Sequence, residues 1–369
     1  MQFTSAQWYY NGLLGLEGRS VATKAASLAA ANTQMFTEAG SAGAVVAQML
    51  GANRALADAI GVRLRERPPA FVVGIGRGSS DHAGVYAKYL IEQRLGVVSA
   101  AAGLSLSSVY HRTANLSQAL CLAISQSGKS PDLIAMVSRA RKAGARTLAL
   151  VNDADSPLAQ AVEDVLPLHA GTEQSVAATK SFIASLAASA LLVGHWAQDE
   201  KLLSDLDRLP EALDRAWQLD WSALDQRLSR SKSLYVLGRG ASYATAREAA
   251  LKFKETCAIH AEAFSSAEVL HGPAALAGSG FAVLAFCQDD EARPGMEDTL
   301  AILRSRGADV LVAGAEVAGT TMLPTLDLHP LLQPIAMAVS FYRSVNALAV
   351  ELGRDPDRPP HLSKVTETF

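Results

Sequence analysis

The chain has 369 residues, of which 49% are apolar and 19% are charged, and its formal net charge is −3. This length exceeds one ordinary domain, and the balance is typical of a soluble globular α/β protein rather than a disordered one. The slightly acidic charge does not favour nucleic acid or an anionic membrane as a partner. The three cysteines, Cys121, Cys257 and Cys287, lie far apart in the sequence, so we expect buried, reduced thiols in a cytoplasmic protein.

The beginning of the chain differs from the remainder. Residues 1–32 show no clear periodicity and then become rich in alanine, so we expect this extension to lie outside the fold. Apolar residues at helical spacing over 33–66 predict one or two helices that lead into the first domain. The longest apolar stretch, 182–196, is interrupted by serine and glycine and is too short to span a bilayer, so it predicts a core helix.

From residue 70 onward, a strand, a glycine-rich turn and a helix follow one another repeatedly. The candidate strands are the short apolar runs at 71–75, 120–125, 146–151, 165–168, 233–237, 281–286 and 308–314. Continuous apolar strands that alternate with amphipathic helices indicate parallel sheets covered by helices on both faces. The predicted fold class is therefore doubly wound α/β.

An internal duplication relates two parts of the chain. Gly76-Arg77-Gly78 recurs 162 positions later as Gly238-Arg239-Gly240, and residues 122–126 align with 284–288 at the same offset. We therefore expect two copies of one unit, joined by helices near 196–230. The predicted boundaries are 33–200 for the first domain with its leading helices, 201–350 for the second domain, and 351–369 for a tail that closes the site.

The two copies differ in one turn. In the first copy, the strand ending at Ser125 runs into Gln126-Ser127-Gly128-Lys129-Ser130-Pro131, and a helix follows. Hydroxyls, a glycine and a proline in the first helical turn suit an anion cradle, at the place where open α/β sheets bind ligands, and Lys129 adds positive charge. The equivalent turn 287–291 is acidic and would repel a phosphate. Ordinary helix capping is the alternative interpretation of the serines.

Charged residues in the second copy suggest proton transfer. Glu248, Lys252 and Glu255 are separated by four and three positions, so a helix places them on one face. An acidic loop with Glu262 and His271 follows. Two acids, an amine and an imidazole are suited to proton transfer on a carbonyl compound. The alternative is an exposed helix ion pair, which contributes only about 0.3–0.5 kcal/mol.

Several familiar motifs are missing from the sequence. Neither Gly-Arg-Gly turn has the third glycine of a dinucleotide fingerprint, and no P-loop pattern occurs. Arg77 and Arg239 are equally compatible with a tight turn and with a ligand contact. The histidines show no metal-binding spacing, so we expect no metal. The small-residue loop 171–180 suits close approach to a ligand, and the extended tail 355–364 either folds over a cleft or remains a disordered end.

These motifs together resemble the SIS-domain sugar-phosphate proteins, in particular the isomerase half of glucosamine-6-phosphate synthase and the SIS-type glucosamine-6-phosphate deaminases. The resemblance covers about residues 33–369 and rests on GRGSS, SQSGKSPD, GTEQSVAATKSF, GRGASY…EAALKFKE, HAEAF…EVLHGP and HLSK. It implies two tandem SIS domains, each a doubly wound, mainly parallel sheet with helices on both faces.

The resemblance also implies roles for individual residues. The phosphate site it implies consists of Ser125, Gln126, Ser127 and Ser130. The sugar contacts it implies are Ser79, Ser80, Val176 and Ala178. Glu255 matches the base that moves a proton between C1 and C2, and Lys252 matches an amine that can form an imine with the ketose. His271 matches a ring-opening residue that reaches in from the partner subunit, which implies a homodimer with shared active sites.

Two further matches and three departures complete the comparison with the family. Glu248 matches a residue beside the acid–base set, Lys364 matches the tail lysine, and neither a metal nor an organic cofactor is implied. Ala178 replaces a serine common in the synthase, and Lys129 stands where the synthase has an acid. Ser130-Pro131-Asp132 is more similar to the deaminases.

The resemblance covers both a synthase and a deaminase, and one feature of the sequence indicates which of the two reactions to expect. The synthase takes ammonia from glutamine through an N-terminal domain with a cysteine directly after the initiator methionine. Here position 2 is Gln and the first cysteine is Cys121, so we expect no use of glutamine. The expected reaction converts glucosamine 6-phosphate and water into fructose 6-phosphate and ammonia. The alternatives are a phosphosugar aldose–ketose isomerase, a deaminase of the galactosamine 6-phosphate type, and a non-catalytic sugar-phosphate-binding regulator.

Overall fold

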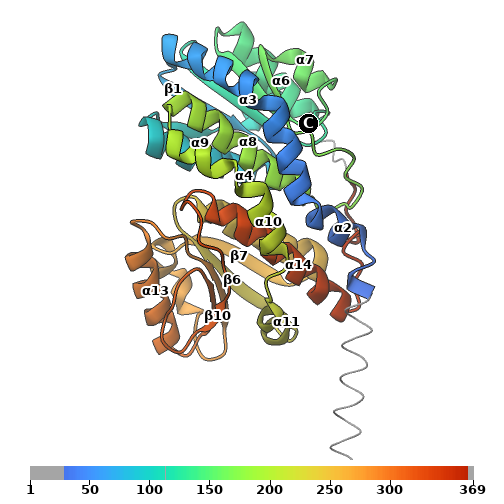
Figure 1. The fold of residues 1–369 in the computed structure, drawn as a ribbon, viewed down its shortest axis with the longest axis vertical. Helices are drawn as coiled ribbons and strands as arrows, with labels where there is room; N and C mark the ends of the chain where they lie inside the picture. The colour runs from blue at the N-terminus through green and yellow to red at the C-terminus, as the bar shows by residue number, and fades with distance from the viewer. Residues whose placement is uncertain (1–28, 113, 365–369) are drawn as a thin grey trace, which may run out of the picture.

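The computed structural model describes residues 29–112 and 114–364 of the chain. These residues form two lobes, one above the other in Figure 1. The first lobe contains a five-stranded sheet in the order β2-β1-β3-β4-β5, and the second contains a five-stranded sheet in the order β10-β9-β8-β6-β7. All neighbouring strands are parallel. The structure confirms the predicted fold class of two tandem, doubly wound units.

The elements follow one another in the predicted alternation. The first lobe consists of β1 (Phe71–Ile75), α4 (Ser79–Leu95), β2 (Ser99–Ala101), α5 (Leu104–Ser108), β3 (Ala119–Ser125), α6 (Pro131–Lys142), β4 (Arg146–Val151), α7 (Pro157–Ala161) and β5 (Asp164–Pro167). The second lobe consists of β6 (Ser233–Gly238), α12 (Ser242–Lys252), the π-helical turn η1 (Phe253–Cys257), β7 (His260–Ser265), the 3₁₀ turns η2 (Glu268–Leu270) and η3 (Pro273–Ala275), β8 (Ala282–Phe286), α13 (Arg293–Ser305), β9 (Asp309–Ala313) and β10 (Thr321–Leu323). The remaining helices are α2 (Gln34–Gly40), α3 (Ala42–Glu66), α8 (Lys180–Ala197), α9 (Glu200–Leu206), α10 (Leu209–Trp217), α11 (Ser222–Leu228) and α14 (Gln333–Glu351).

Strand register confirms the internal duplication. Val72 of β1 is paired with Leu120 of β3, and Leu234 of β6, 162 positions later, is paired with Ala282 of β8. The two sheets also have the same strand order when β1 to β5 are matched in turn with β6 to β10. Both lobes are therefore copies of one unit.

Three edge strands, β2, β7 and β10, were not predicted. Each lies at the border of its sheet and has several half-buried or exposed positions, so it lacks the continuous apolar run of a central strand. Glu262 lies in β7, and the expectation that it belongs to a loop was wrong.

The apolar interior consists of one core shared by both lobes and a smaller core under the outer helices of each lobe. Strand β3 alternates between two of these cores, because successive side chains of a strand point to opposite faces. Leu120, Leu122 and Ile124 enter the shared core, whereas Cys121 faces the smaller one. The shared core unites the lobes into one framework.

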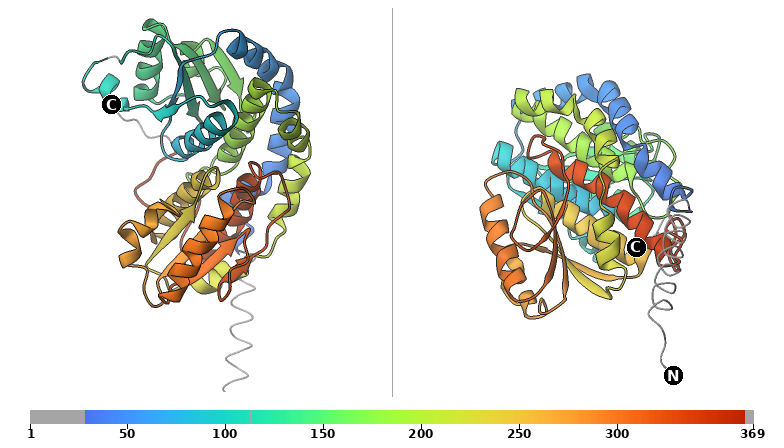
Figure 2. Two further views of the ribbon diagram at one scale, coloured as in Figure 1. Left: turned by 90° about the vertical axis from the view of Figure 1, so that its left-hand side faces the viewer. Right: turned by 60° about the horizontal axis from the view of Figure 1, so that its bottom comes forward.

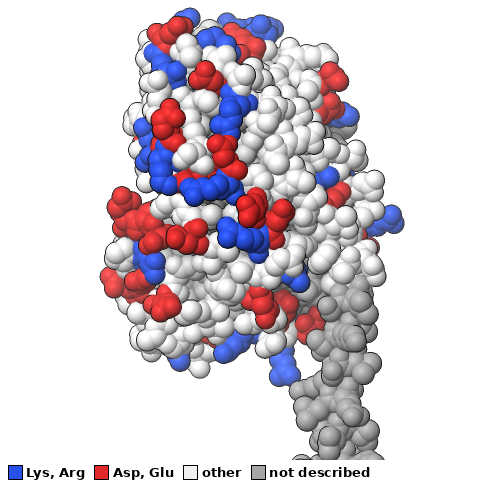
Figure 3. All heavy atoms as spheres, viewed as in Figure 1, with Lys and Arg blue, Asp and Glu red and all other residues white. Residues whose placement is uncertain are grey.

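The helices that connect the lobes run along one side of both of them (Figure 2, left). Helix α8 is buried along nearly its whole length and packs against α3 and α4, which confirms the predicted core helix. Within the described ranges, no helix has both the length and the apolar character needed to cross a bilayer. Basic and acidic side chains are intermingled on the face in Figure 3.

The N-terminal extension falls mostly outside the described residues, since residues 1–28 are not among them. Ala30 is buried, and its carbonyl oxygen accepts a hydrogen bond from Asn346 Nδ2 at 2.9 Å. The described fold therefore begins before residue 33.

Candidate active site

A cavity of about 260 Å³ is lined by residues of both lobes and of the C-terminal tail. The first lobe contributes the turns that follow β1 and β3, the second contributes the end of α12 and η1, and the tail contributes residues 362–364. All but two of the predicted site residues line this cavity, the exceptions being Glu248 and His271. The chain thus brings together segments that are far apart in the sequence.

The predicted anion cradle forms one wall of the cavity. Ser125 Oγ accepts a hydrogen bond from Gly128 N at 3.0 Å, and Ser127 Oγ accepts one from Lys129 N at 3.3 Å. Gly128 has a φ of +63°, and a Cβ there would lie 2.1 Å from Ser156 Oγ, so the turn requires glycine. Ser130 occupies the N-cap position of α6, but its side chain makes no capping hydrogen bond. Helix capping therefore does not explain the Ser130 hydroxyl, and this residue lines the cavity together with Ser125 and Ser127.

Arg77 brings a guanidinium group to the wall of the cavity, where it is paired with a carboxylate. This residue lines the cavity, and its Nε and Nη2 lie 3.0 and 2.6 Å from Oδ2 of the buried Asp132 in the first turn of α6. Lys129 is absent from the lining and lies 3.8 Å from Asp153 at the surface. A contribution of Lys129 to the charge of the cradle therefore stays a prediction.

Three residues of the predicted acid–base set lie on the opposite lobe, where Glu248 and Lys252 are buried and Glu255 is half-buried. Lys252 is 0% exposed, and its Nζ lies 2.6 Å from Glu255 Oε2 and 3.1 Å from Glu248 Oε1. Helix α12 ends at Lys252, and Glu255 belongs to the π-helical turn η1, a feature that is frequent at functional sites. This burial rules out the surface ion pair as an interpretation of the spacing.

The charges in this set stabilise one another. Burial disfavours the charged form of Lys252, but the Glu248 and Glu255 carboxylates outweigh it and raise the pKa of Lys252. Burial alone would likewise raise the pKa of Glu248, yet Lys252 and His82 lower it to about 2. Lys252 is consequently an ammonium group at neutral pH, held between two carboxylates.

Glu248 lies beneath the cavity and accepts several hydrogen bonds. Ser79 Oγ and Tyr342 Oη each donate to Glu248 Oε1 at 3.0 Å, and His82 Nδ1 lies 2.9 Å from Glu248 Oε2. Sequence reasoning missed His82 and Tyr342. His82 follows Ser79 by three positions on α4 and could have been found by helical spacing, whereas Tyr342 on α14 has no local signal.

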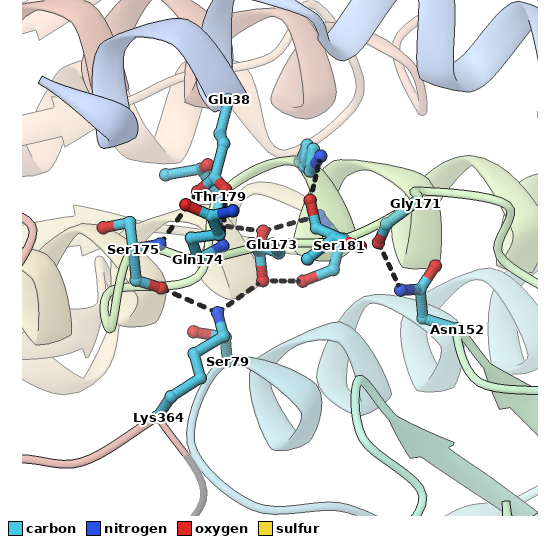
Figure 4. Close-up of polar contacts among 12 residues, drawn as sticks. Glu38, Ser79, Asn152, Gly171, Glu173, Gln174, Ser175, Thr179, Ser181 and Lys364 are labelled. Carbon is cyan, nitrogen blue, oxygen red and sulfur yellow. Dashed lines mark hydrogen bonds and ion pairs between the residues drawn. The ribbon is translucent and has the colours of Figure 1, made fainter.

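The tail is fixed beside the cavity by a buried carboxylate (Figure 4). Lys364 Nζ donates hydrogen bonds to Glu173 Oε2 at 2.9 Å and to the carbonyl oxygen of Ser175 at 2.7 Å. Burial raises the pKa of Glu173, but Lys364 and local hydrogen bonds outweigh it and lower that pKa. Val176 N also donates to the carbonyl oxygen of Asp357 at 3.0 Å. Of the two expectations for the tail, the structure favours folding over the cleft.

His271 lies outside the cavity. It is exposed and directly follows η2, so this chain does not bring it to Glu255. Its role in a partner's site stays a prediction.

The described residues offer no alternative centre of metal or thiol chemistry. Among them, no group of three or more His, Cys, Asp or Glu side chains could hold a metal ion. Cys121, Cys257 and Cys287 are free and buried as predicted, and burial raises the pKa of each thiol to about 12. These thiols are therefore not activated nucleophiles.

The turns at the carboxyl ends of β1 and β3, with their hydroxyl groups, and the charged residues at the end of α12 and in η1 thus line one cavity of an α/β protein. The chain belongs to the SIS-domain family, whose profile matches residues 70–194 and 227–318.

Known proteins resemble this chain to different degrees. It is 35% identical over 327 residues to glutamine–fructose-6-phosphate aminotransferase (isomerizing) of Thermus thermophilus, a match that covers 83% of this chain and 53% of that protein. The chain thus spans about half the length of the curated relatives it matches. A Silicibacter pomeroyi protein, provisionally assigned as a phosphosugar isomerase, is 43% identical with a TM-score of 0.85, and the match covers 88% of this chain and all of that one. Glucosamine-6-phosphate deaminase of Thermotoga maritima has a TM-score of 0.73 at 21% identity, over 91% of this chain and all of that one, which shows the fold alone.

Proposed function

We propose that this chain converts glucosamine 6-phosphate and water into fructose 6-phosphate and ammonia. The observation that supports this proposal most strongly is that one cavity contains both the hydroxyl cradle and Glu255 with its Lys252 partner. The cradle binds the phosphate, with Arg77 adding positive charge, while the acid–base set faces the other end of the sugar. Phosphate binding thereby positions C1 and C2 for proton transfer.

The chemistry requires two proton shifts and one hydrolysis. Glu255 takes the proton from C2 of the open-chain amino sugar and returns it to C1, while the C1 oxygen gains the proton that the C2 amine loses, so that the aldehyde becomes an alcohol and the amine at C2 becomes a ketimine. The Lys252 ammonium stabilises negative charge that develops on the sugar oxygen in the transition state. Water then adds to C2, and the C2–N bond breaks with release of ammonia.

The charge state of Lys252 favours direct hydrolysis over an imine with this lysine. An amine must lose its proton before it can attack a carbonyl carbon, and the two carboxylates raise the pKa of Lys252. Lys252 therefore acts in this mechanism as an electrostatic partner of Glu255 rather than as a nucleophile.

A homodimer with shared sites would supply His271 as the ring-opening residue. Coexpression of Glu255→Gln and His271→Ala chains tests this proposal, because a mixed dimer then contains one intact site. We expect each variant alone to be inactive and the mixture to recover part of the activity. Failure of the mixture to exceed the separate variants would contradict shared sites.

A phosphosugar aldose–ketose isomerase is the second candidate, favoured by the assignment of the 43% identical Silicibacter pomeroyi protein. The deciding experiment gives glucosamine 6-phosphate to the purified protein without glutamine and measures ammonia and fructose 6-phosphate together. Equal amounts of both products support the deaminase. Interconversion of fructose 6-phosphate with an aldose phosphate, without ammonia from the amino sugar, supports the isomerase. A raised melting temperature without any product would instead indicate a binding protein.

A further inference from the structure

His82 is a buried histidine that the mechanism above does not use. It lies on α4 of the first lobe and is 9% exposed, yet its Nδ1 is 2.9 Å from Oε2 of Glu248 on α12 of the second lobe. The pair therefore joins the two lobes directly beneath the cavity. The equivalent position in the second copy is Ala244, so this contact is not part of the duplicated framework.

The hydrogen bonds around Glu248 give His82 a distinct role. Oε1 is contacted by Ser79, Tyr342 and Lys252, at 3.0, 3.0 and 3.1 Å. Among the described residues, the contact to Oε2 comes from His82. Because Glu248 is a carboxylate, its Oε2 accepts the hydrogen bond, and His82 Nδ1 carries the proton and donates it. Loss of His82 would leave a charged oxygen buried without its donor, and the carboxylate would reorient.

The position of Glu248 is passed on to the reacting groups. Lys252 Nζ lies between Glu248 Oε1 at 3.1 Å and Glu255 Oε2 at 2.6 Å. Of these three charged residues, Lys252 and Glu255 line the cavity and Glu248 does not. We propose that His82 is a positioning residue, which holds Glu248 so that Lys252 and Glu255 keep their places against the sugar. This inference rests on the proposed function only in taking Glu255 as the group that moves the proton.

The expected signature is a loss of turnover without a loss of binding. Replacement by alanine, His82→Ala, should lower kcat about 10- to 100-fold. KM should change little, because the cradle at Ser125–Ser130 is made by other residues. His82→Asn should restore much of kcat, since the asparagine amide can donate a hydrogen bond from a position near that of Nδ1. Tyr342→Phe, which removes a donor to the other oxygen, should act in the same direction.

A second histidine–carboxylate pair supplies a matched control. His195 Nδ1 lies 3.3 Å from Asp58 Oδ1, and its side chain is 12% exposed, but it does not line the cavity. His195→Ala should change the melting temperature and leave kcat unaltered. A merely structural His82 would behave in the same way, and that result would overturn the inference. Equal losses of kcat in His82→Ala and His82→Asn would also overturn it.

The assay can separate this inference from the proposed function. Each variant is incubated with fructose 6-phosphate in D₂O, and deuterium entering at C1 is followed by NMR, alongside ammonia release from glucosamine 6-phosphate. Deuterium exchange without ammonia in the wild type would refute the deaminase and still test His82, because exchange needs only the base. If the wild type shows neither deuterium exchange nor ammonia release, Glu255 is not the base of this mechanism. The inference about His82 then fails with it.

Discussion

The turns that follow β3 and β8 occupy equivalent places in the two lobes and have opposite properties. After β3, serine hydroxyls and the glycine at position 128 leave a cavity open. After β8, the side chain of Gln288 is buried and donates hydrogen bonds to the Arg239 carbonyl oxygen at 2.7 Å and to Asp290 at 2.8 Å. The second turn also borders a cavity of about 200 Å³, but it presents Asp289, Asp290 and Glu291 there, and these carboxylates would repel an anion.

The helices that follow β1 and β6 also differ, but here it is the second copy that carries the charged side chains. Glu248, Lys252 and Glu255 of the second copy correspond to positions 86, 90 and 93 of the first, which are tyrosine, leucine and glutamine. Tyr86 and Leu90 are buried in the shared core. Both copies have therefore kept the fold but contribute different side chains to the cavity, the serine turn from the first and the charged residues from the second.

The largest expected effect tests whether the second copy supplies the chemistry. Glu255→Gln keeps the shape of the side chain but removes the base, so kcat should fall about 10²- to 10⁴-fold. Binding of fructose 6-phosphate, measured by calorimetry, should stay near the wild-type value because the cradle is intact. Unaltered turnover would exclude Glu255 as the base.

Acid titration tests the charged cluster in the second copy. The pKa of Glu248 is lowered from 4.5 to about 2 in the folded chain, so its contribution to stability is present above about pH 4.5 and is lost as the pH falls toward 2. We expect the free energy of unfolding, measured with urea, to fall by a few kcal/mol in that window. The fall should be shallower in Glu248→Gln. Glu200→Gln, which removes an exposed carboxylate on α9, is the control and should follow the wild type.

Gly128→Ala tests whether the open turn depends on its glycine. A Cβ at this position would lie 2.1 Å from Ser156 Oγ on a backbone with a φ of +63°, so we expect a loss of about 1–3 kcal/mol in the free energy of unfolding. Gly51→Ala in α3, where a Cβ would meet nothing within 4 Å, should instead stabilise by about 0.5–1 kcal/mol. Equal effects of the two substitutions would contradict the steric argument.

The smallest expected effect compares the two turns directly. Ser127→Ala should raise KM about tenfold, because one hydrogen bond to a charged phosphate is lost. The equivalent residue in the second copy is Asp289, which makes a surface ion pair with Arg293 at 2.9 Å. Asp289→Ala should leave KM unchanged. A fall in kcat alone for Ser127→Ala would place the phosphate elsewhere.

The sequence by itself determined the elements whose chemistry is local. Apolar runs predicted the central strands, the 162-residue offset predicted two equivalent sheets, and the spacing of Glu248, Lys252 and Glu255 predicted their contact. Such features depend on strand alternation and helical period, which short segments of chain define. Three of the four edge strands, β2, β7 and β10, were missed because most of their positions are exposed or half-buried and their pattern is weak.

Only the tertiary structure decided which side chains meet across the lobes. It placed Arg77 in the lining of the cavity, paired Lys364 with Glu173, and brought His82 and Tyr342 to Glu248. The contacts of Glu248 with Tyr342 and His82 and of Glu173 with Lys364 join residues that are 94 to 191 positions apart in the sequence. No local period relates such positions, because their distance depends on how the shared core sets one lobe against the other.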